Sequence, residues 1–331
     1  MISFDYICRR QPQTDCLYGM KNADRRIDIM GIVNVTDNSF FAGSRCLGAD
    51  GMADVRAVRE RVRQMISEGA TIIDIGACST KPGSEPVSRQ TEWERLKPVL
   101  ESVWEDCRGI TLSIDTFRSE TAMRTFGLLA ELEADRPEYA GCADGAVRAR
   151  KFVAGRLLIN DISAGEDDPA MLGAVGAAGL GYVAMHKRGT PQTMQDMCDY
   201  ADVTCEVAEY FTGFAARAEK AGIRNWILDP GFGFAKTVAQ NYELLRNLER
   251  FSEPFGGSPR RVLVGLSRKS MIYKLFGITP EESLPQTQVL DFAALLGGAD
   301  ILRVHDVAEA ARTVAIYSRL RSVPASVLSV R

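Results

Sequence analysis

Residues 225–236 read Asn-Trp-Ile-Leu-Asp-Pro-Gly-Phe-Gly-Phe-Ala-Lys. The apolar run at 226–228 is typical of a buried strand, and a proline and two glycines then end any regular element. Leucines at helical spacing follow at 241–248. The stretch therefore predicts a strand, a glycine-rich bend and a helix, with Asp229 at the strand end and Lys236 after the bend. Strand ends of this kind carry the chemistry of α/β enzymes, although a tight turn capped by Asp229 is the simpler alternative.

The same strand-and-helix unit recurs along the chain. The strand-like runs are continuously apolar instead of alternating, which is typical of parallel strands buried on both faces. Strict alternation of strand and helix predicts a parallel sheet, and eight units predict its closure into a barrel. The expected strands are 28–35, 71–75, 110–114, 157–160, 181–185, 226–228, 261–265 and 300–305. The expected helices are 52–66, 88–104, 119–132, 169–178, 202–221, 241–248, shorter pieces between 269 and 296, and 307–320.

An open, doubly wound sheet is the competing architecture, but no G-x-G-x-x-G follows the first strand to support it. We therefore predict an α/β fold with a single (β/α)8 TIM barrel over residues 27–331. Residues 1–26 are expected to form an N-terminal extension. Residues 133–153 are an insertion between the third helix and the fourth strand, so they belong at the bottom of the barrel, as a solvated insertion or a contact surface.

Composition narrows the class of protein. With 46% hydrophobic and 25% charged residues, the 331-residue chain is ordinary for a soluble globular enzyme, and a net charge of −3 argues against a nucleic-acid-binding surface. No apolar run approaches the roughly 20 residues that span a bilayer, and the first ten residues lack the apolar core of a signal peptide. The eight cysteines contain no C-x-x-C pair. We expect reduced thiols, no structural zinc, no membrane partner and a cytoplasmic location.

In a barrel of this kind the C-terminal strand ends converge on one opening. Each expected strand end carries polar residues directly after apolar ones, which favours a shared ligand site over eight separate caps. The residues concerned are Asn34, 79–83, Asp115, Thr116, Asn160, Asp161, Met185, His186, Asp229, 267–270, Arg303 and His305.

Arg303 and His305 are two residues apart on one expected strand, so their side chains should point the same way. Two such groups side by side suit an anion such as a phosphate. The alternative is that Arg303 pairs with a neighbouring acid and His305 caps the last helix. His186 is the only other histidine, which argues against a multi-histidine zinc site. Oxygen ligands suit Mg²⁺, and Asn34 is the candidate ligand.

Asp115, Asn160 and Asp229 are short acceptors on three different strands. A carboxylate accepts two parallel N–H bonds, and an amino group beside a ring N–H presents such a pair. Lys269 could donate to a ring carbonyl. Together these groups indicate a planar, nitrogen-rich ring better than a sugar or an acyl chain.

Motifs at the successive strand ends carry a resemblance to a known family. From residue 29 to residue 320 the sequence strongly resembles the dihydropteroate synthases, which are pterin-binding barrels. Each motif is weak alone, but together and in this order they are highly specific. The motifs are residues 29–36, 73–76, 79–83, 113–116, 159–161, 185–186, 229–236, 267–270 and 303–305.

The resemblance implies a homodimeric transferase of folate biosynthesis. It would join p-aminobenzoate to 6-hydroxymethyl-7,8-dihydropterin diphosphate, giving 7,8-dihydropteroate and pyrophosphate, with Mg²⁺ as cofactor. The resemblance also implies roles for individual residues. The pterin would contact Asp115, Asn160, Met185, Asp229 and Lys269. The diphosphate would contact Asn34, as the metal ligand, together with Arg303 and His305. The p-aminobenzoate would contact Thr80, Pro82, Phe234, Ser267 and Phe40. Lys269, Arg303 and His305 are the expected catalytic residues.

The sequence departs from the family pattern in two loops. The family usually has Pro then Asp where this chain has Asp37 and Asn38, and Glu and Arg where it has Cys78 and Lys81. We expect these changes to affect specificity toward the arylamine more than they affect binding in the pterin pocket. Two other functions stay open: a barrel that transfers a methyl group from a methylated folate, and a pterin-binding paralogue without turnover. The motifs at 267–270 and 303–305 favour the synthase, because a methyl transferase has no diphosphate to hold.

Overall fold

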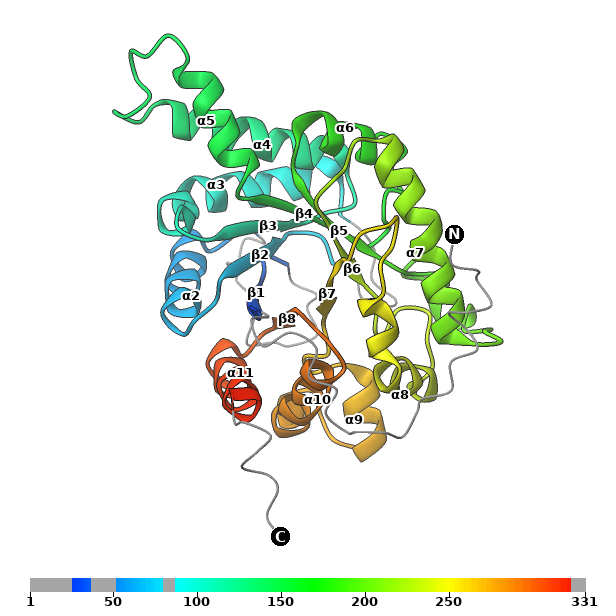
Figure 1. Ribbon diagram of the computed structural model, residues 1–331. Helices are drawn as coiled ribbons and strands as arrows, with labels where there is room; N and C mark the ends of the chain where they lie inside the picture. The colour runs from blue at the N-terminus through cyan, green and yellow to red at the C-terminus, as the bar shows by residue number, and fades with distance from the viewer. Residues whose placement is uncertain (1–25, 37–51, 80–86, 323–331) are drawn as a thin grey trace.

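The computed structural model describes residues 26–36, 52–79 and 87–322, and within them eight parallel strands form a closed barrel. Each strand pairs with the next in sequence, and β8 returns to pair with β1, as Asp28 opposite Ile301 shows. The predicted (β/α)8 barrel is therefore confirmed. The strands, at the centre of Figure 1, are β1 Asp28–Asn34, β2 Ile72–Gly76, β3 Thr111–Asp115, β4 Leu157–Asp161, β5 Gly181–Met185, β6 Trp226–Asp229, β7 Arg261–Val264 and β8 Ile301–Val304.

Helices form the outer layer around the strands (Figure 1). Their apolar faces pack on the barrel, and none of the described helices combines the length and apolar character needed to cross a bilayer. The α-helices are α2 Val55–Ser67, α3 Arg89–Cys107, α4 Ser119–Ala134, α5 Gly145–Ala154, α6 Met171–Ala178, α7 Val203–Lys220, α8 Val238–Arg246, α9 Ser270–Phe276, α10 Leu284–Leu296 and α11 Val307–Ser322. Three short 3-10 helices are η2 Met194–Asp196, η3 Leu248–Ser252 and η4 Glu281–Ser283.

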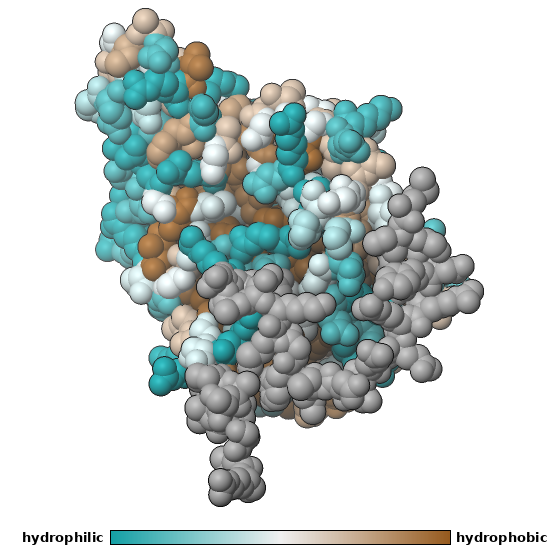
Figure 2. Space-filling model, in the orientation of Figure 1, coloured by the Kyte–Doolittle hydropathy of each residue, from teal (hydrophilic) through white to brown (hydrophobic). Residues whose placement is uncertain are grey.

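The expected insertion at residues 133–153 contains a helix that the sequence pattern did not predict. This helix, α5, lies against α4 on the outside of the barrel (Figure 1), with Ala149 and Val153 buried at helical spacing. Arg156 covers the ring of Phe152 at 3.9 Å. The surface over these two helices is mostly hydrophilic on the face shown in Figure 2. The N-terminal extension remains a prediction, because residues 1–25 lie outside the described part of the chain.

The interior of the barrel is built in two layers. An apolar layer closes it, with one side chain from each of seven strands: Met30, Ile72, Leu158, Val183, Ile227, Leu263 and Ile301. Side chains two positions further along a strand point to the same side. The next interior layer therefore contains Ile32, Asp74, Asn160, Met185, Asp229, Gly265 and Arg303. A polar layer thus sits directly on the apolar one.

One buried carboxyl group outside this layer has no hydrogen-bond donor among the described residues. Asp291 on α10 is fully buried, and neither of its oxygens has a hydrogen-bond partner among the described residues. Burial raises the pKa of Asp291 to about 8, and the charge of Asp306 adds to the shift. The unfolded chain loses this proton near pH 4 and the folded chain only near pH 8. Stability therefore falls across this window as the pH rises.

Replacing this carboxyl group should stabilise the protein. We expect Asp291→Leu to raise the free energy of unfolding by about 2 kcal/mol at pH 8 and by less at pH 5. Urea denaturation at the two pH values measures the difference. Thr125→Val is the matched control, since it also removes a buried oxygen without a partner but one that does not ionise. Equal effects of Asp291→Leu at both pH values would contradict the prediction.

Candidate active site

Asp74 and Arg303 form the centre of the polar layer. The Nε of Arg303 donates to Oδ2 of Asp74 at 2.7 Å, and its Nη2 donates to Oδ2 of Asp115 at 2.8 Å. The side-chain amide of Asn160 donates to the same Asp74 oxygen at 3.0 Å. Four strands, β2, β3, β4 and β8, are tied together in this way. Oδ1 of Asp115 is buried and has no partner among the described residues, so it remains an available acceptor.

Burial and mutual repulsion set the charge state of the acids. Burial raises the pKa of Asp115 to about 7, Arg303 opposes the shift, and Asp74 adds to it. Burial works against the charge of Arg303, but Asp74 and Asp115 together raise its pKa. Asp115 is therefore poised to ionise fully when a ligand offers it N–H donors, because hydrogen bonds to the charged form lower the pKa of a carboxyl group.

Asp229 and Lys269, at the opening, influence each other's pKa values. The Oδ1 of Asp229 accepts from the backbone N–H of Gly231 at 2.8 Å. The ammonium of Lys269 donates to the carbonyl of Phe232 and lies 5.1 Å from the ring centre of Phe234. Burial raises the pKa of Asp229 and Lys269 opposes that shift, whereas burial lowers the pKa of Lys269 to about 8. Gly265 lies beside this lysine, since a Cβ there would be in ordinary van der Waals contact with Nζ at 3.9 Å.

His305 lies one residue beyond β8 and is bound to the loop after β7. Its Nδ1 is 2.9 Å from the hydroxyl of Ser267, and its backbone N–H donates to the same oxygen at 3.2 Å. Arg61 on α2 donates to the His305 carbonyl at 2.7 Å. Burial lowers the pKa of His305 to about 3, with Arg303 contributing, so the imidazole is neutral at physiological pH.

The described site residues fall into two groups. Asp115, Asn160, Met185, Asp229, Lys269 and Arg303 lie in or above the polar layer. Ser267 and His305 lie beside it, with Phe234 in the bend and Asn34 at the end of β1. Phe40, Thr80 and Pro82 lie outside the described residues, as do Asp37, Asn38 and Lys81.

Arg303 and His305 have different hydrogen-bond partners, although Arg303 also acts on the pKa of His305. Two donor groups of Arg303 bind carboxylates, as in the alternative noted from the sequence. The imidazole of His305 contacts the hydroxyl of Ser267.

Asp74 is a residue of the candidate site that the strand-end pattern of the sequence did not predict. It lies in the middle of β2, is fully buried, and accepts from both Arg303 and Asn160. A sequence signal was present, because Asp74 interrupts the apolar run Ile72-Ile73-Asp74-Ile75. A charged residue within a strand that is buried on both faces requires a partner in the interior.

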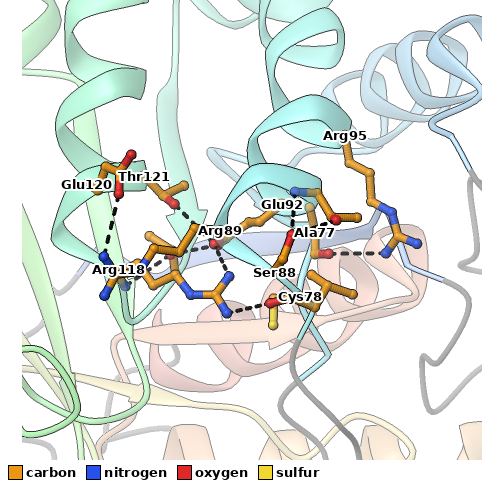
Figure 3. Close-up of polar contacts among 12 residues, drawn as sticks. Ala77, Cys78, Ser88, Arg89, Glu92, Arg95, Arg118, Glu120 and Thr121 are labelled. Carbon is orange, nitrogen blue, oxygen red and sulfur yellow. Dashed lines mark hydrogen bonds and ion pairs between the residues drawn. The ribbon is translucent and has the colours of Figure 1, made fainter.

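A second buried network flanks the loop after β2 (Figure 3). Glu92 on α3 accepts from Arg118 at 2.6 Å and from two threonine hydroxyls. Arg118 also donates to the carbonyl of Val87 at 2.5 Å, and Arg95 donates to that of Ala77. These contacts hold the described residues on both sides of segment 80–86. Cys78 next to this network is buried, which raises the pKa of its thiol to about 11.

Within the described residues no three or more His, Cys, Asp or Glu side chains gather as a metal-binding cluster. Asn34, half-buried at the end of β1, offers one amide oxygen. Mg²⁺ usually takes only one or two protein oxygens and completes its shell with phosphate and water. The donor set is therefore compatible with Mg²⁺ held largely by a phosphorylated ligand.

Comparison with known proteins identifies the class. A family model described as pterin binding enzyme matches residues 30–129 and 142–305. The chain therefore belongs to the pterin-binding enzyme family.

Individual relatives narrow the class further. The dihydropteroate synthase of Escherichia coli K12 is 37% identical over 283 residues, covering 85% of this chain and 87% of that protein. A mitochondrial folate synthesis bifunctional protein of Arabidopsis thaliana is 35% identical over 97% of this chain, which spans 55% of that protein's length. The Burkholderia cenocepacia dihydropteroate synthase, solved with 7,8-dihydropteroate, superposes with a TM-score of 0.71 at 31% identity, covering 90% of this chain and 93% of that one.

The contribution of Asp74 to the free energy of unfolding can be measured. Asp74→Leu leaves Arg303 with one carboxylate instead of two and leaves the Asn160 amide unpaired, so we expect a loss of about 3 kcal/mol in the free energy of unfolding. Ser113→Ala is the control, because Ser113 pairs with Asp74 in the sheet register and its buried hydroxyl has no partner in the described structure. Urea denaturation measures both variants. A loss below about 1 kcal/mol for Asp74→Leu would show that the interior tolerates the unpaired groups.

Proposed function

We infer that this chain is a dihydropteroate synthase. It is a transferase of folate synthesis that joins a pterin diphosphate to p-aminobenzoate. The observation that carries this inference is the polar layer, where Asp115, Asn160 and Asp229 lie in one opening with Lys269 and Arg303. Family membership and the match to dihydropteroate synthases over most of their length support the same function.

The proposed pterin site uses the acids as paired acceptors. The free Oδ1 of Asp115 and the carboxylate of Asp229 suit the amino and ring N–H groups of the pterin, and Asn160 offers an amide beside them. Lys269 supplies a donor for the ring carbonyl. Because Lys269 also offsets the charge of Asp229, the site receives an uncharged heterocycle without leaving a buried charge unpaired.

The proposed diphosphate site lies toward His305 and Ser267. A neutral imidazole and a hydroxyl can donate to phosphate oxygens, and the bonds of Arg303 to Asp74 and Asp115 use its Nε and Nη2 but not its Nη1. Asn34 would hold Mg²⁺ at this end. When bound, Mg²⁺ would neutralise charge on the departing oxygens.

The reaction needs no side-chain nucleophile. The bond between the pterin methylene carbon and the diphosphate oxygen breaks, and its electron pair leaves with pyrophosphate. The arylamine nitrogen then forms a bond to that carbon and loses a proton. Asp115 and Asp229 stabilise the ring while positive charge develops on it, and His305 and Arg303 stabilise the leaving anion. Phe234 and Ser267 are the described residues proposed for the p-aminobenzoate pocket, with Thr80, Pro82 and Phe40 completing it.

We extend the proposal to a cytoplasmic homodimer. Among the described residues, Cys142 is an exposed free thiol, which supports a reducing compartment. The family resemblance is the basis for the dimer.

A coupled assay tests the function directly. Purified protein, supplied with the pterin diphosphate, p-aminobenzoate and Mg²⁺, should release pyrophosphate and form 7,8-dihydropteroate. We expect Asp229→Asn to weaken binding of a pterin analogue about 100-fold, because it leaves a ring donor without an acceptor. Ser113→Ala should bind like the wild type. Folded wild-type protein that binds the pterin but gives no product would contradict the synthase and favour a binding protein.

The metal can be tested through the same assay. Chelation should abolish turnover, and added Mg²⁺ should restore it. Asn34→Ala should raise the Mg²⁺ concentration for half-maximal activity about 10-fold, since the ion loses a protein ligand. Turnover that persists in excess chelator would remove Mg²⁺ from the proposal.

A further inference from the structure

Lys236, at the end of the glycine-rich bend, is a buried lysine that the proposed chemistry does not use. Its ammonium lies 2.9 Å from the carbonyl of Gly231, 3.1 Å from that of Phe234 and 3.1 Å from Nδ1 of His186. An ammonium has three N–H donors, and these three acceptors match them. While Lys236 is charged, His186 therefore accepts at Nδ1 and carries its own proton on Nε2.

The bend curls around this ammonium. Gly231 has a left-handed φ of 72°, and a Cβ at this position would lie 1.9 Å from the carbonyl oxygen of His186. Only glycine permits such a close approach. The bend is thus pressed against the end of β5, where the backbone N–H of His186 donates to the carbonyl of Asp229 at 3.0 Å.

Asn241 on α8 holds the bend from the other side. Its Oδ1 accepts from the backbone N–H of Gly233 at 2.7 Å, and its Nδ2 donates to the carbonyls of Lys236 and Thr237 at 3.2 and 2.7 Å. With His186 on one side and Asn241 on the other, contacts from the end of β5 and from α8 fix the conformation of the bend.

The bend in turn positions the groups that face the opening. Its backbone N–H at Gly231 orients the Asp229 carboxylate, and its carbonyl at Phe232 accepts from Lys269. The ring of Phe234 lies beside the same lysine. A change in the shape of the bend therefore moves an acid, a base and an aromatic ring together.

We propose that Lys236 and His186 are positioning residues of the pterin site. Their contacts hold the bend in the shape that places Asp229 and Lys269 for the heterocycle. This inference rests on the proposed function, because it assigns the two residues to the same ligand.

The charges around the bend provide a second measurable quantity, the pKa of Asp229. Lys269, Arg303 and Lys236 face Asp229, while Asp229, Lys269, Arg188 and Cys198 surround Lys236. Burial lowers the pKa of Lys236 to about 7, and Asp229 opposes that shift. In return Lys236 lowers the pKa of Asp229, which burial raises. Removing the ammonium should therefore raise the pKa of Asp229 further.

The test is Lys236→Met in the full chain, with 6-hydroxymethylpterin as the probe in isothermal titration calorimetry between about pH 5 and pH 9. We expect the affinity to fall about 30-fold, because small displacements of binding groups have effects of this size. The acidic limb of the binding profile should also move to higher pH, since Asp229 must be ionised to accept two N–H groups.

Lys187→Met is the matched control. Lys187 is the next residue after His186 and is also buried, but its ammonium binds Asp167 and the carbonyl of Gly189, each at 2.9 Å. This variant should lose stability yet keep the pterin affinity and the acidic limb of the wild type.

A pair of His186 variants keeps the test decisive if Lys236→Met fails to fold. Asn can place an oxygen near the position of Nδ1, so His186→Asn should retain most of the affinity, whereas His186→Leu should lose about 10-fold. Unchanged affinity and pH profile in folded Lys236→Met, or equal affinities of the two His186 variants, would overturn the proposal. Failure of the wild type to form dihydropteroate would instead count against the proposed function, and the binding experiments would still test the positioning role.

Discussion

Charge compensation inside a closed barrel is the constraint on which this structure depends. An ion without a partner is costly in the interior, so a buried acid is stabilised by a neighbouring base or keeps its proton. Asp74 and Asp115 share Arg303, and Asp229 is offset by Lys269. Because these residues come from β2, β3, β6, β8 and the loop after β7, the compensation holds the strands in register and also defines the site.

The apolar and polar layers follow from one geometric rule. Side chains on a strand alternate between the two faces, so the residue two positions after an interior aliphatic side chain also faces inward. Ile72 is followed by Asp74, Ile227 by Asp229, and Ile301 by Arg303. The hydrophobic layer therefore does more than stabilise the barrel. It forms the floor that excludes water beneath the polar groups and strengthens their interactions with a ligand.

The bend after β6 connects this layer to its surroundings. It takes its shape from a lysine within it, a histidine on the neighbouring strand end and an asparagine on the next helix. The carbonyl of Phe232 in the bend accepts from Lys269, which lies in the loop after β7. Backbone carbonyls therefore couple the ends of three consecutive strands, β5, β6 and β7. A side-chain substitution cannot remove these carbonyls, but a change in the conformation of the bend can displace them.

The sequence by itself determined the barrel and most of the described residues at its opening. Strand periodicity, glycines and prolines act over a few residues, so the eight units and the strand-end residues Asp115, Asn160 and Asp229 could be predicted locally. The role of Asp74, the separate partners of Arg303 and His305, and the contact between Lys236 and His186 were decided only by the tertiary structure. Arg303 and Asp74 are 229 residues apart, and Lys236 and His186 are 50 apart. Which acid meets which base depends on the stagger and closure of the sheet, and no local pattern encodes that geometry.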